Sequence, residues 1–133
     1  MSATAIMRAL LLAHAPLTAL VPAARIVNGD VPAGSLPAIG VREISSIERD
    51  SVARAGNSVI TARVQVTVYA TCYTEQVAIL KAAKLAPGTH TGVVAGYEVR
   101  SVLRDIVGPD LGNDAAQTFE QSRDFKVTYV EPA

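Results

Sequence analysis

The sequence has few of the residues on which catalytic and metal sites usually depend. Its 133 residues include one cysteine (Cys72), two histidines (His14 and His90) and no tryptophan. A single cysteine excludes a disulfide within the chain, so we expect a reducing compartment. Neither histidine has a carboxylate or a cysteine at metal-ligand spacing, and the sequence therefore predicts no metal site. Cys72 directly precedes a predicted helix, where a cysteine can be reactive, but we interpret it as a buried or half-buried bystander.

The chain also lacks an excess of either charge. Twelve lysines and arginines balance twelve aspartates and glutamates, which gives a formal net charge of zero. A protein that holds DNA through its backbone usually carries a basic excess, because each neutralised phosphate needs a cation. Neutrality favours association instead, since like subunits do not repel one another over a long range.

No apolar run is long enough for a membrane helix, which takes about 20 residues. Residues 1–24 have the outline of a signal peptide, with small residues at positions 21–24. His14, Pro16 and Thr18 interrupt its apolar part, and we therefore favour a folded helix from Ser2 or Thr4 to about His14.

Motifs for catalysis or cofactor binding are also missing. The glycines at positions 88, 92 and 96 do not match a phosphate-binding loop. The carboxylate pairs that could serve as acid and base, Asp105 with Asp110 and Glu120 with Asp124, read more simply as solvated charges at strand ends. We therefore expect no enzyme, no catalytic residue and no cofactor.

What the sequence does contain is one long alternating stretch, residues 60–71. Its even positions are Ile, Ala or Val, and its odd positions are polar or aromatic. Twelve residues of strict alternation predict a strand with one buried face. The polar face carries one charge, Arg63, beside Gln65, Thr67 and Tyr69. These four form a strip suited to meeting a neighbouring subunit or lining a channel.

The rest of the chain predicts three more long strands and a second helix. The strands are expected at 38–48, 93–107 and 118–130, and the helix at 74–86, with Val77 on its packed face. We expect Ile47 to point inward, and Ile44, which breaks the alternation, to mark either an edge position or a bulge. Tyr97, Val99, Ser101 and Leu103 are expected to share one side of their strand.

The order helix, strand, strand, helix, strand, strand favours an α+β fold. We predict a single domain, residues 1–133, with helices packed on one face of a mainly antiparallel four-stranded sheet. A short strand at 25–27 would lie in the irregular connection between positions 23 and 37.

Two long connections separate the predicted strands, at residues 49–58 and 108–116. Hairpin loops usually have 2–5 residues, and greater length is often functional. The alternative is tolerance of extra length at the surface. On the functional interpretation, the charged and amide side chains of the loops are candidate contacts with other proteins: Arg49, Asp50, Arg54, Asp110, Asn113 and Asp114.

Several blocks, in this order and spacing, resemble the tail completion or tail terminator family of long-tailed phages and gene transfer agents. They are ALLLAHAPLTALV (9–21) followed by Arg25-Ile26, LPAI (36–39), RVQVTVYA (63–70), YTE (73–75), GVVAGYEVRS (92–101) and SRDFKVTY (122–129). They cover nearly the whole chain. The departure is Ala38-Ile39, where the family often has an aromatic residue after the proline.

The resemblance implies a non-enzymatic virion protein that forms a ring, usually a hexamer. Such a ring caps the tail tube and joins it to the connector, or stopper, below the head. Its partners would be further copies of itself, the major tail tube protein and the connector. DNA would pass through the lumen without sequence-specific binding. The protein would be assembled in the host cytoplasm and reside at the neck end of the virion tail, with no membrane contact.

Two other interpretations remain open. One is another neck component, such as a head-closure or adaptor protein. The other is a small α+β enzyme or ligand-binding domain that uses Cys72 or the acids at the strand ends.

Overall fold

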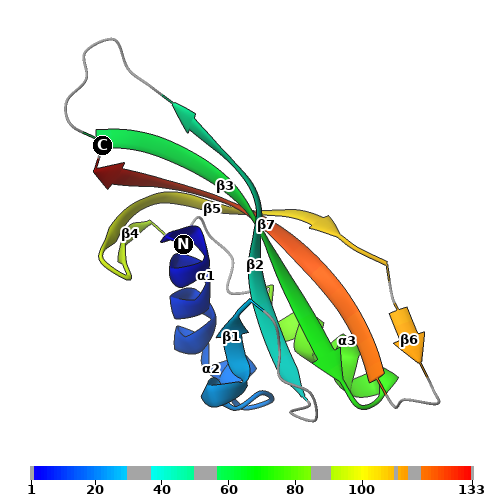
Figure 1. Cartoon of the computed structure of the whole chain (residues 1–133). Helices are drawn as coiled ribbons and strands as arrows, with labels where there is room; N and C mark the ends of the chain where they lie inside the picture. The colour runs from blue at the N-terminus through cyan, green and yellow to red at the C-terminus, as the bar shows by residue number, and fades with distance from the viewer. Residues whose placement is uncertain are drawn as a thin grey trace.

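A computed structural model describes residues 2–29, 37–49, 57–84, 91–109, 111–113 and 118–132. The helices are α1 (Ser2–Ala13), α2 (Ala15–Thr18), the 3-10 turn η1 (Ala23–Arg25) and α3 (Tyr73–Ala82). The strands are β1 (Ile26–Asn28), β2 (Ala38–Arg49), β3 (Asn57–Ala70), β4 (Gly92–Val94), β5 (Tyr97–Val107), β6 (Leu111–Asn113) and β7 (Thr118–Pro132). Figure 1 shows the long strands side by side in one strongly twisted sheet.

All seven of these strands belong to one sheet, in the order β1-β2-β3-β7-β5-β4, with β6 also paired to β7. The four long strands run antiparallel to their neighbours, and β1 pairs in parallel with the start of β2. Register shifts interrupt β2 between Glu43 and Ser45, and β5 between Val99 and Ser101 and again after Arg104. Bulges of this kind increase the twist and bend a strand, which accounts for the curl of the sheet in Figure 1.

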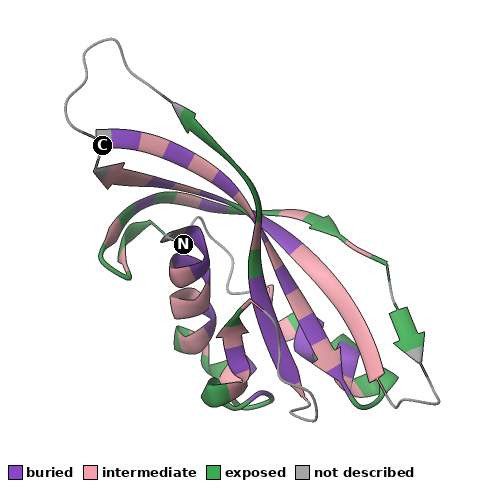
Figure 2. Cartoon of the chain, in the orientation of Figure 1, coloured by how far each residue is buried: buried purple, intermediate pink, exposed green. Residues whose placement is uncertain are grey.

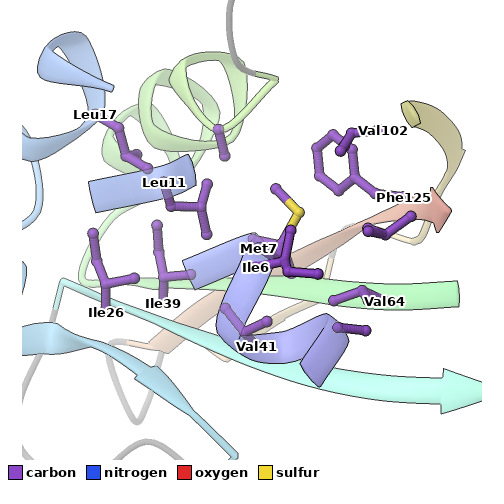
Figure 3. Close-up of a cluster of buried hydrophobic side chains, with 14 of the residues drawn as sticks. Ile6, Met7, Leu11, Leu17, Ile26, Ile39, Val41, Val64, Val102 and Phe125 are labelled. Carbon is purple, nitrogen blue, oxygen red and sulfur yellow. The ribbon is translucent and has the colours of Figure 1, made fainter. Parts of the chain in front are cut away.

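The core fills the hollow side of this curled sheet, against α1 (Figure 3). The alternating apolar side chains of β3, including Val64 and Val66, are fully buried, and Phe125 of β7 lies beside them. From α1, Ile6, Met7 and Leu11 are fully buried. Each such side chain contributes about 1.5–3 kcal/mol by leaving water. We call this side of the sheet the inner face, and the opposite side the outer face.

Figure 2 makes the alternation visible along β3, where buried and half-buried residues succeed one another from Ser58 to Ala70. The prediction of a strand with one buried face over residues 60–71 is therefore confirmed. Phe125, Val127 and Tyr129 of β7 are also buried together on the inner face, as the period of two predicts.

The predicted fold class is wrong. The described chain is mostly β, with a curled seven-stranded sheet, and not a four-stranded α+β layer with helices packed on one face. The predicted strand 93–107 is a hairpin, because Ala95 and Gly96 both have positive φ and turn the chain between β4 and β5. The short strand expected at 25–27 is present as β1, whereas β6 lies in a segment interpreted as a connection. The helices are short, and the sheet curls around α1.

Four predicted side-chain positions are also wrong, and three of them because of bulges. The extra residue at Ile44 shifts the phase of β2, so Ile47 pairs with Thr61 on the outer face and is 67% exposed. The register shift after Val99 likewise moves Ser101 and Leu103 to the outer face, and Leu103 is 50% exposed. On α3, Val77 is exposed, and Gln76 takes the buried position.

Candidate functional site

The outer face of β3 and β7 gathers most of the polar side chains that the sequence analysis selected. The odd residues of β3 from 61 to 69 are half-buried there, and their neighbours on β7 are polar too. Among the described residues, the helices contact the sheet from its inner face, where their apolar side chains join the core. The outer face therefore presents a polar surface that no described helix covers.

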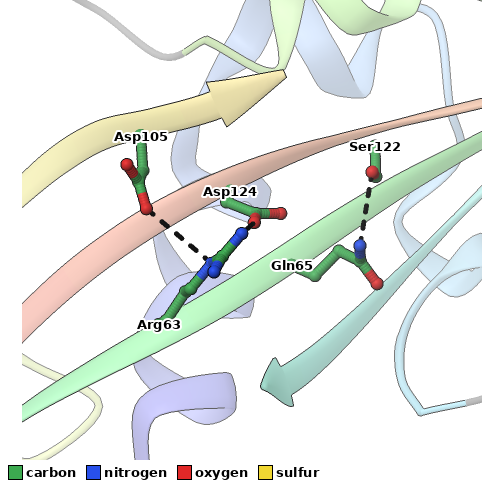
Figure 4. A network of polar contacts seen from close by, with 5 residues as sticks. All are labelled: Arg63, Gln65, Asp105, Ser122 and Asp124. Atoms are coloured by element: carbon green, nitrogen blue, oxygen red, sulfur yellow. Dashed lines mark hydrogen bonds and ion pairs between the residues drawn. The ribbon is translucent and has the colours of Figure 1, made fainter. Parts of the chain in front are cut away.

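Arg63 is the centre of this surface (Figure 4). Its Nη2 and Nε lie 2.6 and 2.8 Å from Oδ2 of Asp124, and its Nε lies 3.7 Å from Oδ2 of Asp105. Asp124 is only 5% exposed at its side chain, whereas Arg63 is 37% exposed. Both guanidinium donors converge on one carboxylate oxygen, so the pair fixes the position of Arg63 across the β3–β7 ladder.

Two further contacts extend this pair along the same ladder. Gln65 Nε2 donates to Ser122 Oγ at 3.3 Å, and the hydroxyls of Thr61 and Thr128 lie 3.1 Å apart. The threonines are direct partners in the register, whereas Gln65 reaches diagonally to Ser122. The result is a row of polar groups held in place before any partner arrives, and such preorganisation lowers the cost of binding.

A groove of about 300 Å³ lies at the far end of this row. Its walls come from three parts of the chain, and the lining residues are Gln65, Thr67, Tyr69, Pro109, Leu111, Glu120, Gln121 and Ser122. Gly108 N donates to Ser122 O at 2.8 Å, and Gln121 Nε2 donates to Gly108 O at 2.9 Å. These bonds fix residue 108 against β7, where the second long connection begins.

Two neighbouring arginines, Arg104 and Arg123, lie on the inner face beside α3. Arg104 Nε donates to Lys84 O at 3.3 Å near the end of α3. Arg123 lies close to it, and its Nε is buried with no hydrogen-bond partner. Burial, together with the neighbouring positive charge of Arg104, lowers the pKa of Arg123. This corner therefore accumulates positive charge.

Side chains with catalytic or metal-binding potential do not come together in the described chain. Cys72 is exposed at the N-cap position of α3, so the expectation that it is buried or half-buried is wrong, while His14 lies at the start of α2. His90 lies outside the described residues. Within the described ranges, no three His, Cys, Asp or Glu residues are placed to share a metal ion, and no helix has the length and apolarity to cross a membrane.

The structure describes only some of the predicted contact residues. Arg63, Gln65, Thr67 and Tyr69 share the outer face of β3 as predicted. The backbones of Arg49 and Asn113 end β2 and β6. The remaining candidates lie outside the described residues: Asp50, Arg54, Asp110 and Asp114.

Sequence reasoning missed the partners of this strip. Asp105 and Asp124 were considered as members of two separate acid–base pairs, but the fold brings both to Arg63 as ion-pair partners. The alternation of residues 118–130 does place Asp124 opposite Phe125, on the polar side. That β7 lies directly beside β3 could not be read from that pattern.

The architecture defines a class of fold: a mostly β chain whose curled sheet holds an N-terminal helix. No family model and no curated protein matches the chain. Among solved structures, it is similar to a chain of a structure described as "Virion of native gene transfer agent (GTA) particle". The TM-score is 0.67, each chain is covered over 97% of its length, and 17% of the residues are identical. At this identity, the likeness shows a shared fold.

Proposed function

We propose that this protein is a structural component of the virion of a tailed phage or a phage-like gene transfer agent. In particular, we propose that it forms a hexameric ring that caps the tail tube and joins it to the head–tail connector. The ring would assemble in the host cytoplasm and remain at the neck of the virion. No catalytic step belongs to this role.

One observation carries the proposal. The fold likeness to a chain from the gene transfer agent virion spans 97% of both chains, with a TM-score of 0.67. The likeness supports a virion structural protein, and the more specific tail terminator role rests on the resemblance of the sequence blocks to that family.

Two properties of the chain suit a ring subunit. Its zero net charge places no long-range repulsion between copies. The polar row of the outer face holds Arg63 and Gln65 in fixed positions through partners on β7. We propose that this row, with Thr67 and Tyr69 beside the groove, meets a neighbouring subunit or the DNA-containing channel.

The two long connections would reach the proteins above and below the ring. Their candidate contacts with the tail tube protein and the connector are Arg49, Asp50, Arg54, Asp110, Asn113 and Asp114. Substituting these residues in groups, one loop at a time, should weaken attachment to one partner while leaving the isolated protein folded.

The test is the state of the purified protein and of the assembled particle. We expect light scattering to show a closed oligomer at rising concentration, and electron microscopy to show rings. Deleting the gene should give tails of uncontrolled length, or tails that fail to join heads. A protein that is monomeric in solution and forms no ring in tails would refute the proposal.

The fold likeness to a virion chain also fits a second candidate, a head-closure or adaptor protein of the same neck. The deletion phenotype separates the two. Tails of normal length that join heads which leak DNA would favour head closure over tail termination.

A further inference from the structure

Each of the two long edges of the sheet is only partly covered by a further strand in the described chain. β1 covers β2 only along Ile39–Val41, and β4 covers β5 only along Tyr97–Val99. The remaining stretches, residues 42–49 of β2 and 100–107 of β5, are equal in length and have no further strand beside them among the described residues. We call them the β2 edge and the β5 edge. Unpaired backbone donors and acceptors on an edge are a template for another strand.

We propose that the β2 edge of one copy pairs with the β5 edge of the next copy, so that one sheet continues around the ring. The inference rests on the proposed function, because it assigns the surfaces through which the ring closes. Since the two edges lie on opposite sides of the sheet, the contact is head-to-tail, and a head-to-tail contact forms a ring when the rotation between copies closes.

The apolar side chains of the two edges match on the outer face. Ile47 of the β2 edge pairs with Thr61 on that face and is 67% exposed, and Leu103 of the β5 edge faces the same way and is 50% exposed. Exposed aliphatic residues on an edge strand are a hazard unless another chain covers them. Pairing of the two edges would bury the side chains of Ile47 and Leu103 in the same contact.

The charged side chains match on the inner face. Glu43 and Glu48 of the β2 edge pair with the buried Val64 and Ile60, so they point to the inner side. Arg104 of the β5 edge pairs with Phe125 on the same side, next to Arg123. The acids of one edge therefore approach the positively charged corner of the other, and opposite charges across a contact favour one pairing over its alternatives.

The surface beside the β2 edge has space for the β5 edge of a neighbouring copy. A hollow of about 500 Å³ borders its first residues, and it is lined by Thr4, Ala5, Asn28, Gly29, Val41, Arg42 and Glu43. The strand directions are suitable too. β2, β3, β7 and β5 alternate in direction, so a rotated copy that keeps its strands roughly parallel to the ring axis presents its β5 edge antiparallel to β2.

The test blocks each edge separately. Ile47→Lys should prevent assembly through the β2 edge, and Leu103→Lys through the β5 edge, because a lysine on an edge strand opposes pairing. Ser46→Pro is a second β2 variant, which acts on the backbone rather than on a side chain. Val77→Lys is the matched control, since it places the same charge at an exposed apolar position on α3, outside the two edge strands.

Light scattering should give the 13.9 kDa monomer for each edge variant alone, and the wild-type oligomer for Val77→Lys. An equimolar mixture of Ile47→Lys and Leu103→Lys should give a dimer of twice that mass, because one intact edge of each kind remains. Circular dichroism confirms that each variant is folded.

Rings formed by all the edge variants would overturn this inference and leave the proposed function intact. Assembly blocked by Ile47→Lys but not by Leu103→Lys would overturn it too, because it would indicate a symmetric β2–β2 contact. A wild-type chain that never forms rings would instead refute the proposed function itself.

Discussion

The ion pair between Arg63 and Asp124 supports the strongest prediction for the isolated protein. Asp124 is nearly buried and receives two donors from Arg63, at 2.6 and 2.8 Å. Arg63→Ala leaves that carboxylate without its main partner, and breaking a buried pair on one side costs about 3–5 kcal/mol. Because Arg63 itself is 37% exposed, water replaces part of the lost interaction. We therefore expect a loss of about 2 kcal/mol in the free energy of unfolding, near the value for a hydrogen bond to a charged group.

The pair can be isolated with a double-mutant cycle of Arg63→Ala and Asp124→Ala, measured by urea unfolding. A coupling energy of about 1–2 kcal/mol is expected, because the two residues are in direct contact. Asp105→Ala is the matched control. Its carboxylate is 3.7 Å from Arg63 and more exposed, so its removal should cost less than about 1 kcal/mol.

Equal effects of Asp105→Ala and Asp124→Ala, or a coupling energy near zero, would refute this reasoning. Either result would mean that the polar row of the outer face is not fixed before a partner binds. The proposal that the row is a preorganised contact surface would then lose its physical basis.

Three further outcomes follow from the packing and from the turns. Phe125→Ala removes the largest fully buried side chain and should cost about 3–5 kcal/mol, measured by the shift in the urea midpoint. Gly108→Ala places a Cβ 2.6 Å from Ser122 Oγ; it should lower the thermal midpoint and disturb the groove beside β7, and an unchanged midpoint would contradict this. Ala95→Asn should raise the free energy of unfolding by about 0.5–1 kcal/mol, because Ala95 has φ +52° and Asn-Gly is a preferred pair for such a hairpin turn. A thermal midpoint that falls would show that the turn is not the source of strain.

The local pattern of the sequence predicted those features that a single strand determines by itself. Strict alternation over residues 60–71 identified the buried and polar faces of β3, and the disruption at Ile44 identified the bulge in β2. Both signals lie within a few neighbouring residues. They need no knowledge of which strands pair.

The sequence pattern did not predict the side-chain directions that bulges change or the contacts between distant strands. A single extra residue in β2 turned Ile47 outward, and one in β5 turned Leu103 outward, because a shift by one residue exchanges the faces of a strand. The hairpin at Ala95-Gly96 lacks the usual asparagine or aspartate before the glycine, so the sequence read as one continuous strand. The contacts of Arg63 with Asp105 and Asp124 join residues from three strands, and strand order is not encoded in any one segment.

The central claim is that this chain is a ring-forming component at the neck end of a tail. Electron cryomicroscopy of assembled particles, combined with an affinity tag on the chain, tests it most directly. We predict one ring of this protein between the tail tube and the connector, with the β2 edge of each copy beside the β5 edge of its neighbour. Particles in which the tag lies elsewhere, or from which the protein is absent, would contradict the claim.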